Sequence, residues 1–192
     1  MRIINLKRTI IIFLMIGIIA VVPGCVRWPD GSEGEPEETD YQLRITVKVE
    51  GEIAPLEGKY YIVLDTDGNP IDGPDYDMAY WDGFYYVKLD KWGINFTKVE
   101  EEETSIPLTN YSISGDTLQV TIALSSLEDP DSIDINVVTT DSDDETYYDY
   151  LDDYFTVNTL LYSTAVGTTG GGPEEGGENF NITEVTAEII SY

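Results

Sequence analysis

Apolar and polar residues alternate with a period of two in the part of the chain that follows residue 40. The clearest cases are Ile45–Glu50 and Thr117–Leu124, in which every second residue is aliphatic. Because successive side chains of a β-strand point to opposite faces, this period places the aliphatic residues on one buried face. Further strands are predicted at Lys59–Leu64, Gly83–Leu89, Ile94–Val99, Ile133–Thr139, Asp152–Thr159 and Ile182–Ile190.

Residues typical of tight turns separate these predicted strands. Asp67–Pro70, Ser114–Asp116 and Glu128–Pro130 combine Asp or Asn with Gly or Pro, which favour turns through side-chain hydrogen bonds and special backbone angles. No window of about 11 residues after Cys25 keeps the period of 3.6 that a helix requires. We therefore expect residues 41–192 to form an all-β, antiparallel, jelly-roll-like β-sandwich of about eight strands.

Two features near the C-terminus refine this expectation. The run Gly167–Gly177 (GTTGGGPEEGG) predicts a flexible loop before the last strand. The alternation within that strand slips near Glu184 and Val185, which predicts a β-bulge.

The N-terminus has the parts of a secretory signal. A basic start precedes an apolar run from Ile10 to Val22, and Gly24 stands before Cys25, the only cysteine. This arrangement resembles a lipoprotein lipobox, so residues 1–24 are predicted to be a signal peptide and Cys25 the lipidated residue. The protein is then expected at the outer face of the cell membrane or envelope, held to the bilayer by its lipid. The alternative is a signal anchor, but the apolar run spans only about 20 Å as a helix.

Charge narrows the range of partners. Residues 25–40 are predicted to be a disordered acidic tether, since they contain Pro, Gly and acidic residues and few apolar ones. The formal net charge is −27, and removal of residues 1–24 would lower it to −30. Such a charge repels phosphate groups, which excludes nucleic acid as a partner. It indicates either a solvated, exported surface or a set of cation sites.

Several segments resemble those of a known group of β-sandwiches. Tyr61–Pro70 (YIVLDTDGNP), Gly73–Tyr76 (GPDY) and Trp81–Tyr86 (WDGFYY) resemble a pattern of DOMON-like domains, a group that includes the family 9 carbohydrate-binding modules. Ser114–Leu127 is similar to a later strand of that group. The resemblance implies a two-sheet sandwich with, in some members, structural calcium and a sugar site. Other members bind haem through Met and His, which this chain does not support because it has no His.

A run of oxygen-bearing side chains lies between the second and third predicted strands. Its members are Asp65, Asp67, Asn69, Asp72, Asp75 and Asp77. Calcium takes six to eight oxygen ligands in irregular geometry, so this run predicts a calcium site. The run is not an EF-hand, because Gly68 comes too early and the twelfth position is Tyr76 rather than Glu. The alternative is a series of Asx turns that cap a hairpin.

Aromatic residues predict a second kind of site. Aromatic faces pack against the apolar side of a pyranose, and neighbouring carboxylates accept its hydroxyl groups. For the residues around the third strand the alternative is core packing, and for those in the acidic run Asp141–Asp153 it is an exposed, soluble loop. The candidate ligand-binding residues are Tyr80, Trp81, Tyr85, Tyr86, Trp92, Tyr147 and Tyr148.

The composition of the chain argues against an enzyme. Without His, and with Cys25 as the only cysteine, the chain offers no nucleophile–His pair and no ordinary zinc ligand set. We therefore expect a non-catalytic, lipid-anchored surface domain that binds calcium and a carbohydrate. The alternative is a structural, assembly or adhesion subunit that contacts other proteins through an open sheet edge.

Overall fold

The computed structural model describes residues 40–69, 71, 73–100, 104–161, 163–167, 172 and 175–191. These residues belong to one compact unit, Thr39–Tyr192. The predicted signal peptide, Cys25 and the predicted tether up to residue 39 lie outside the described residues. Within the described part of the chain, no helix is long and apolar enough to cross a membrane.

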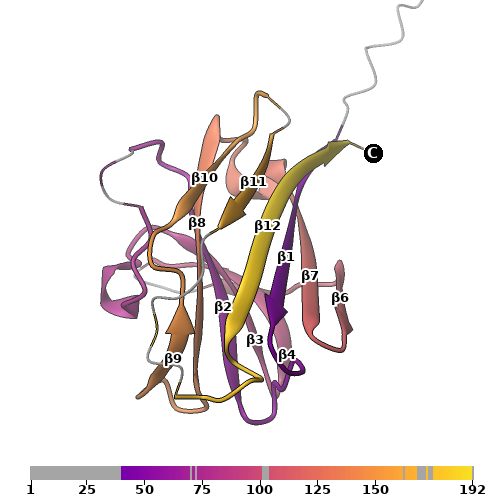
Figure 1. The fold of residues 1–192 in the computed structure, drawn as a ribbon. Helices are drawn as coiled ribbons and strands as arrows, with labels where there is room; N and C mark the ends of the chain where they lie inside the picture. Colours follow the sequence, from indigo (N-terminus) through magenta and orange to yellow (C-terminus); the bar gives the residue numbers. More distant parts are fainter. Residues whose placement is uncertain are drawn as a thin grey trace, which may run out of the picture. The chain divides into compact units, whose positions relative to one another are not determined.

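Two antiparallel sheets pack face to face (Figure 1). The smaller sheet has the strand order β11-β12-β1-β7-β6. Its strands are β1 (Tyr41–Val49), β6 (Tyr111–Ser114), β7 (Thr117–Ala123), β11 (Thr164–Gly167) and β12 (Ile182–Ser191).

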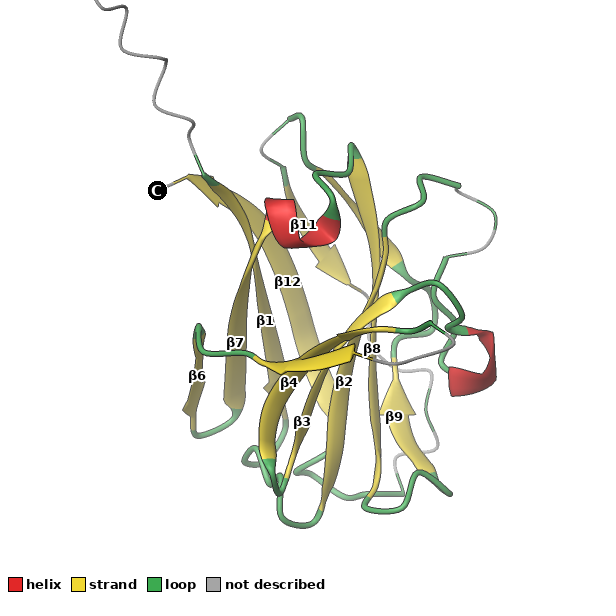
Figure 2. Ribbon diagram, turned by 180° about the vertical axis from the view of Figure 1, so that it is seen from behind, coloured by secondary structure: helices red, strands yellow, loops and turns green. Residues whose placement is uncertain are grey.

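The larger sheet has the order β10-β8-β2-β3-β4-β5, and β9 also pairs with β8. Its strands are β2 (Gly58–Asp65), β3 (Tyr85–Asp90), β4 (Gly93–Lys98), β5 (Thr104–Pro107), β8 (Ser132–Asp141), β9 (Tyr147–Tyr150) and β10 (Phe155–Asn158). Two short 3₁₀ helices, η1 (Met78–Tyr80) and η2 (Leu124–Leu127), lie in the connections and are drawn in red in Figure 2.

The prediction of an all-β, antiparallel sandwich is confirmed. Each of the eight strands expected from the alternation is present, and the four that the alternation missed, β5, β6, β9 and β11, are each four residues long. The bulge expected in the last strand is also present, because Lys48 pairs with Glu184 whereas Val49 pairs with Ile182. Thr183 is therefore the extra residue.

The main core lies between the sheets. Alternate residues of β1 and β7 point into it, among them Ile45, Val47 and Val120, and they meet residues such as Ile62 and Ile135 of the larger sheet. This is the arrangement that the period of two predicts, with one apolar face for each strand.

The outer faces of the two sheets differ. The smaller sheet shows polar side chains to solvent, including the cross-strand pairs Arg44–Glu188 at 3.0 Å and Lys48–Glu184 at 2.7 Å. The larger sheet is covered, since the connection between β2 and β3 folds back over it. A second apolar cluster forms there from Tyr61, Val63, Trp81 and Val138. As a result, β2 and β8 are buried on both faces along most of their length.

Candidate functional site

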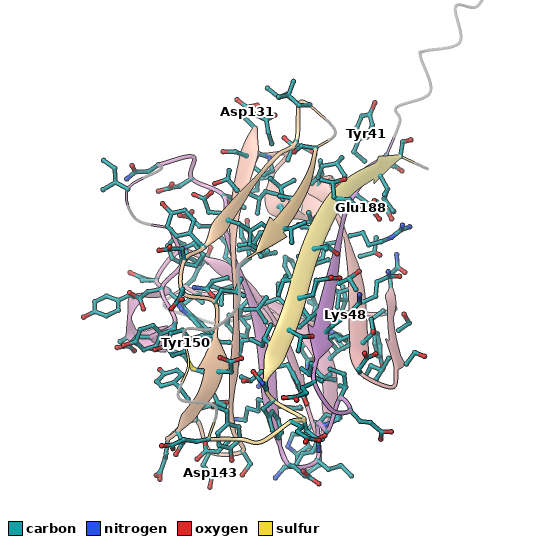
Figure 3. The ribbon with its side chains drawn as sticks, viewed as in Figure 1. Tyr41, Lys48, Asp131, Asp143, Tyr150 and Glu188 are labelled. Atoms are coloured by element: carbon teal, nitrogen blue, oxygen red, sulfur yellow. The ribbon has the colours of Figure 1, made fainter. Side chains whose placement is uncertain are left out.

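A cavity of about 450 Å³ opens on the outer face of the larger sheet, beside the second cluster. We call it the tyrosine groove and define it by six of its lining residues. Two segments far apart in the sequence supply them, the β2–β3 connection and the residues at and after the end of β9. Figure 3 marks Tyr150 on this side of the domain. The six residues are Asp75, Tyr76, Tyr150, Asp152, Asp153 and Tyr154.

The wall formed by the β2–β3 connection is held by hydrogen bonds to buried side chains. Asn136 of β8 is buried and donates through Nδ2 to the carbonyl oxygen of Pro74, at 2.9 Å. Trp81 donates through Nε1 to the carbonyl oxygen of Asp75, at 2.8 Å. These two bonds bracket the segment Pro74–Asp75, so Tyr76 follows from a fixed backbone.

Stacked aromatic rings join the two walls of the groove. Tyr76 and Tyr150 lie face to face, with ring centroids 4.2 Å apart and an interplanar angle of 13°. Tyr147 meets Tyr76 edge to face at 5.6 Å. Tyr76 is 40 % exposed and Tyr150 is half-buried, so the stacked pair still presents aromatic surface to a ligand.

Tyr154 closes the far side of the groove. A β-carbon added to Gly73 would lie 2.5 Å from the Tyr154 ring, far inside van der Waals contact. Only glycine at position 73 therefore lets the loop backbone lie against this ring. A Gly73→Ala change would force the Tyr154 ring to shift.

The hydroxyl groups of Tyr147 and Tyr150 stay protonated at neutral pH, because the pKa of each is raised. Burial is the largest cause that raises the pKa of Tyr150 above its ordinary value, and the nearby Tyr76 and Asp152 raise it further. Burial also raises the pKa of Tyr147, whose hydroxyl accepts a hydrogen bond from the Met78 amide at 3.3 Å and lies 3.4 Å from Asp77 Oδ1. A protonated phenol both donates and accepts, which suits recognition of hydroxyl groups.

The predicted calcium ligands are engaged locally with the backbone. Side-chain oxygens of Asp65, Asp67, Asp75 and Asp77 each accept from the amide two residues later, at 2.6 to 3.1 Å. These are the Asx turns that were the alternative interpretation of the run. Asp72 lies outside the described residues, and Asn69 takes part through its amide N–H.

The described residues contain no group of three or more His, Cys, Asp or Glu side chains arranged to hold a metal ion. Calcium binding by this loop stays a prediction. A cation that binds only the folded state at a hundredfold excess over Kd stabilises it by about 2.7 kcal/mol, which corresponds to a rise in melting temperature of roughly 5–10 °C. Millimolar calcium is expected to produce this shift in a thermal melt.

Magnesium at the same concentration is the control, because general screening of a polyanion responds to both ions whereas an irregular oxygen cage favours the larger one. The double change Asp65→Asn with Asp67→Asn is expected to remove the calcium shift. Equal shifts from the two ions would contradict a calcium site in this loop.

The aromatic residues predicted to form one sugar-binding platform lie in different parts of the fold. Trp81 is only 3 % exposed and packs in the second cluster, and Tyr85 is buried between the sheets, where it stacks on Phe96. Neither presents a face to a ligand, so both are withdrawn as binding residues. Tyr86 packs on the opposite face of β3 from Tyr85, against Trp81 at 6.0 Å.

The remaining candidates are also dispersed. Trp92 is 82 % exposed at the β3–β4 turn, and Tyr80 is exposed in η1. Tyr147 borders the groove through its contact with Tyr76, whereas Tyr148 packs against Phe180 of the main core at 5.0 Å. Among the predicted ligand-binding residues that the structure describes, Tyr147 is the one whose ring pairs with a tyrosine of the groove, Tyr76.

Comparison of the chain with models of known protein families, with curated proteins and with solved structures gave no match. The resemblance to DOMON-like sandwiches therefore stays an expectation, and the argument for function comes from the chain's own geometry.

Proposed function

We propose that the protein is a non-catalytic binding domain that takes a neutral glycan in the tyrosine groove. The observation that carries the proposal is the convergence of Tyr76, Tyr150 and Tyr154 with three aspartates around one cavity of about 450 Å³. A cavity of this size falls within the range of small-ligand sites and accommodates one or two sugar rings.

The chemistry of the groove favours a sugar over other ligands. Aromatic faces accept the apolar C–H side of a pyranose, while the aspartate side chains accept hydrogen bonds from its hydroxyl groups. The lining contains Asp75, Asp152 and Asp153 and no Lys or Arg among the described residues. An anionic ligand would be repelled here, so the preferred glycan is neutral.

The proposed location follows from the N-terminal sequence. The lipobox-like segment before Cys25 supports export and lipid attachment, which would hold the domain at the outer face of the cell. A glycan-binding domain at that position would retain surface or environmental polysaccharide. The structure does not describe this segment, so the anchor rests on the sequence alone.

The test is a glycan array probed with the full-length chain in detergent, compared with two variants. Tyr150→Ala removes one stacked ring of the groove and is expected to weaken retention of the preferred neutral glycan by about tenfold or more, a typical loss for a stacking aromatic. Tyr111→Ala is the matched control, since Tyr111 lies on β6 of the other sheet and is 44 % exposed. Retention that survives Tyr150→Ala would refute the groove as the glycan site.

A second function is favoured by a different observation. All four residues of β6 are exposed, including Tyr111 and Ile113, and β6 forms an edge of the smaller sheet. An edge strand that carries no charge, Pro or bulge leaves backbone groups open for pairing with another strand. If no glycan is retained and Tyr111→Lys abolishes self-association in sedimentation, the assembly function replaces the glycan function.

A further inference from the structure

Half of the basic residues that the structure describes line one cavity at one end of the sandwich. Six Lys or Arg residues lie in the described part of the chain, and three of them, Lys59, Lys88 and Lys91, line one cavity of about 240 Å³. Trp92 and Leu56 complete its apolar part. We call this cavity the lysine pocket.

The lysine pocket lies at the end of the domain opposite the point where β1 begins. Gly58, at the start of β2, pairs with Asp141 at the end of β8, and the β3–β4 turn joins Asp90 to Gly93 beside them. In Figure 1 these strand ends are at the bottom, and in Figure 3 Asp143 marks this end while Tyr41 marks the other. A tether that precedes Tyr41 would therefore attach at the end far from the pocket.

A tight turn holds Trp92, whose side chain is largely exposed to solvent. Asp90 Oδ1 accepts a hydrogen bond from the Trp92 amide at 2.8 Å, which fixes the turn, and Asp90 Oδ2 lies 3.4 Å from Lys88 Nζ. Trp92 is 82 % exposed and Leu56 is 80 % exposed. A largely exposed Trp and an exposed Leu that line one cavity are unusual on a protein surface and indicate a binding position.

The charges of the pocket leave one uncompensated cation. Lys59 is ion-paired with Asp144, and Lys88 with Asp90. Lys91 forms no ion pair with any residue that the structure describes, and its Nζ lies 5.5 Å from the centroid of the Trp92 ring. The pocket is thus locally positive by one charge in a chain of net charge −27.

We propose that the lysine pocket binds a single acidic pyranose, a hexuronate residue within a glycan, with its ring on Trp92 and its carboxylate on Lys91. A pocket of about 240 Å³ holds one sugar ring, and the indole face accepts the C–H face of that ring. A carboxylate on the ring forms a charge-assisted hydrogen bond to an ammonium group, which a neutral hexose lacks.

The surrounding charge selects the kind of acidic glycan. The net charge of −27 repels a continuous polyuronate at long range, so the expected ligand carries isolated uronate residues. This site is separate from the tyrosine groove, because the two cavities have no lining residue in common. Its existence does not depend on the function proposed for the groove.

The test is a ligand-observed NMR titration of the full-length chain in detergent with methyl glucuronide and with methyl glucoside. Glucuronide is expected to bind with a Kd in the millimolar range, about five- to tenfold more tightly than the glucoside. Lys91→Gln should remove this preference, so that the two sugars bind with about equal affinity, while glucoside binding stays unchanged. Trp92→Ala should weaken both sugars by about tenfold with an unchanged melting temperature, because Trp92 is exposed.

Tyr150→Ala is the matched control and should leave glucuronide binding unchanged, so failure of this site is distinguishable from failure of the groove. Equal affinities for the two sugars, or glucuronide binding that survives Trp92→Ala, would overturn the proposal. Acetate bound as tightly as glucuronide would show that the ring contributes nothing and would also overturn it. The same holds if an acidic peptide with a central aromatic residue binds and glucuronide does not.

Discussion

An Asp149→Ala variant is expected to lose about 3–5 kcal/mol of unfolding free energy, because it leaves one buried and two part-buried backbone donors without this acceptor. Asp149 is 1 % exposed. Its Oδ2 accepts from the amide of Ile182 at 2.7 Å, and its Oδ1 accepts from the amides of Tyr150 at 2.9 Å and Gly172 at 3.2 Å. One side chain thus ties β9 to the start of β12 and to the loop before it.

Urea denaturation followed by circular dichroism measures this loss. Asp143→Ala is the matched control, since Asp143 is an exposed aspartate of the same acidic run, and its replacement is expected to change stability by less than about 0.5 kcal/mol. A loss for Asp149→Ala as small as that for the control would mean that water replaces the lost acceptors and that Asp149 does not hold the strands together.

Nothing local in the sequence distinguishes Asp149 from its acidic neighbours. The run Asp141–Asp153 predicts a single acidic surface, and its members are indeed exposed at Asp143 and Asp152. Asp149 is buried because β9 pairs with β8, which turns Asp149 inward beside Thr139. This pairing depends on contacts between distant segments, so alternation within four residues cannot reveal it.

Strands with a long apolar alternation were predictable, and short edge strands were not. β1 and β7 have one apolar face over seven or more residues, which defines both the strand and its buried side. By contrast, β6 has four exposed residues and no buried face to generate a pattern. Edge strands of this kind depend on pairing with a neighbour rather than on their own burial.

The residue types of the candidate site were predictable, whereas their grouping was not. Tyrosine interleaved with acid in and after β9 indicates a sugar-binding chemistry, and Tyr150 and Tyr154 belong to that run. Their partner Tyr76 comes from the β2–β3 connection, more than 70 residues earlier in the sequence. The connection reaches them only because it folds over the larger sheet, a result of packing that the period of a strand does not encode.

Trp81, together with Asn136, holds this connection on the sheet. Its ring lies 5.4 Å from the Tyr61 ring and 6.0 Å from the Tyr86 ring, and its Nε1 donates to the carbonyl oxygen of Asp75. Trp81 therefore combines the apolar contact that buries the outer face of the sheet with a polar contact that positions one wall of the tyrosine groove.

A Trp81→Ala variant is expected to lose about 3–5 kcal/mol of unfolding free energy in urea denaturation, the usual cost of removing a buried large aromatic side chain. Trp92→Ala is the matched control, because the same substitution at an 82 % exposed position is expected to cost less than about 0.5 kcal/mol. Trp81→Phe helps to separate the two contacts, since it keeps much of the aromatic packing and removes the hydrogen bond. We expect Trp81→Phe to lose some stability through the smaller ring and the lost hydrogen bond, but less than Trp81→Ala, and to weaken neutral-glycan retention, because Tyr76 follows directly from the segment that this bond fixes. Equal stability losses for Trp81→Ala and Trp92→Ala would contradict the second cluster, and full glycan retention by Trp81→Phe would show that the groove does not need the bond.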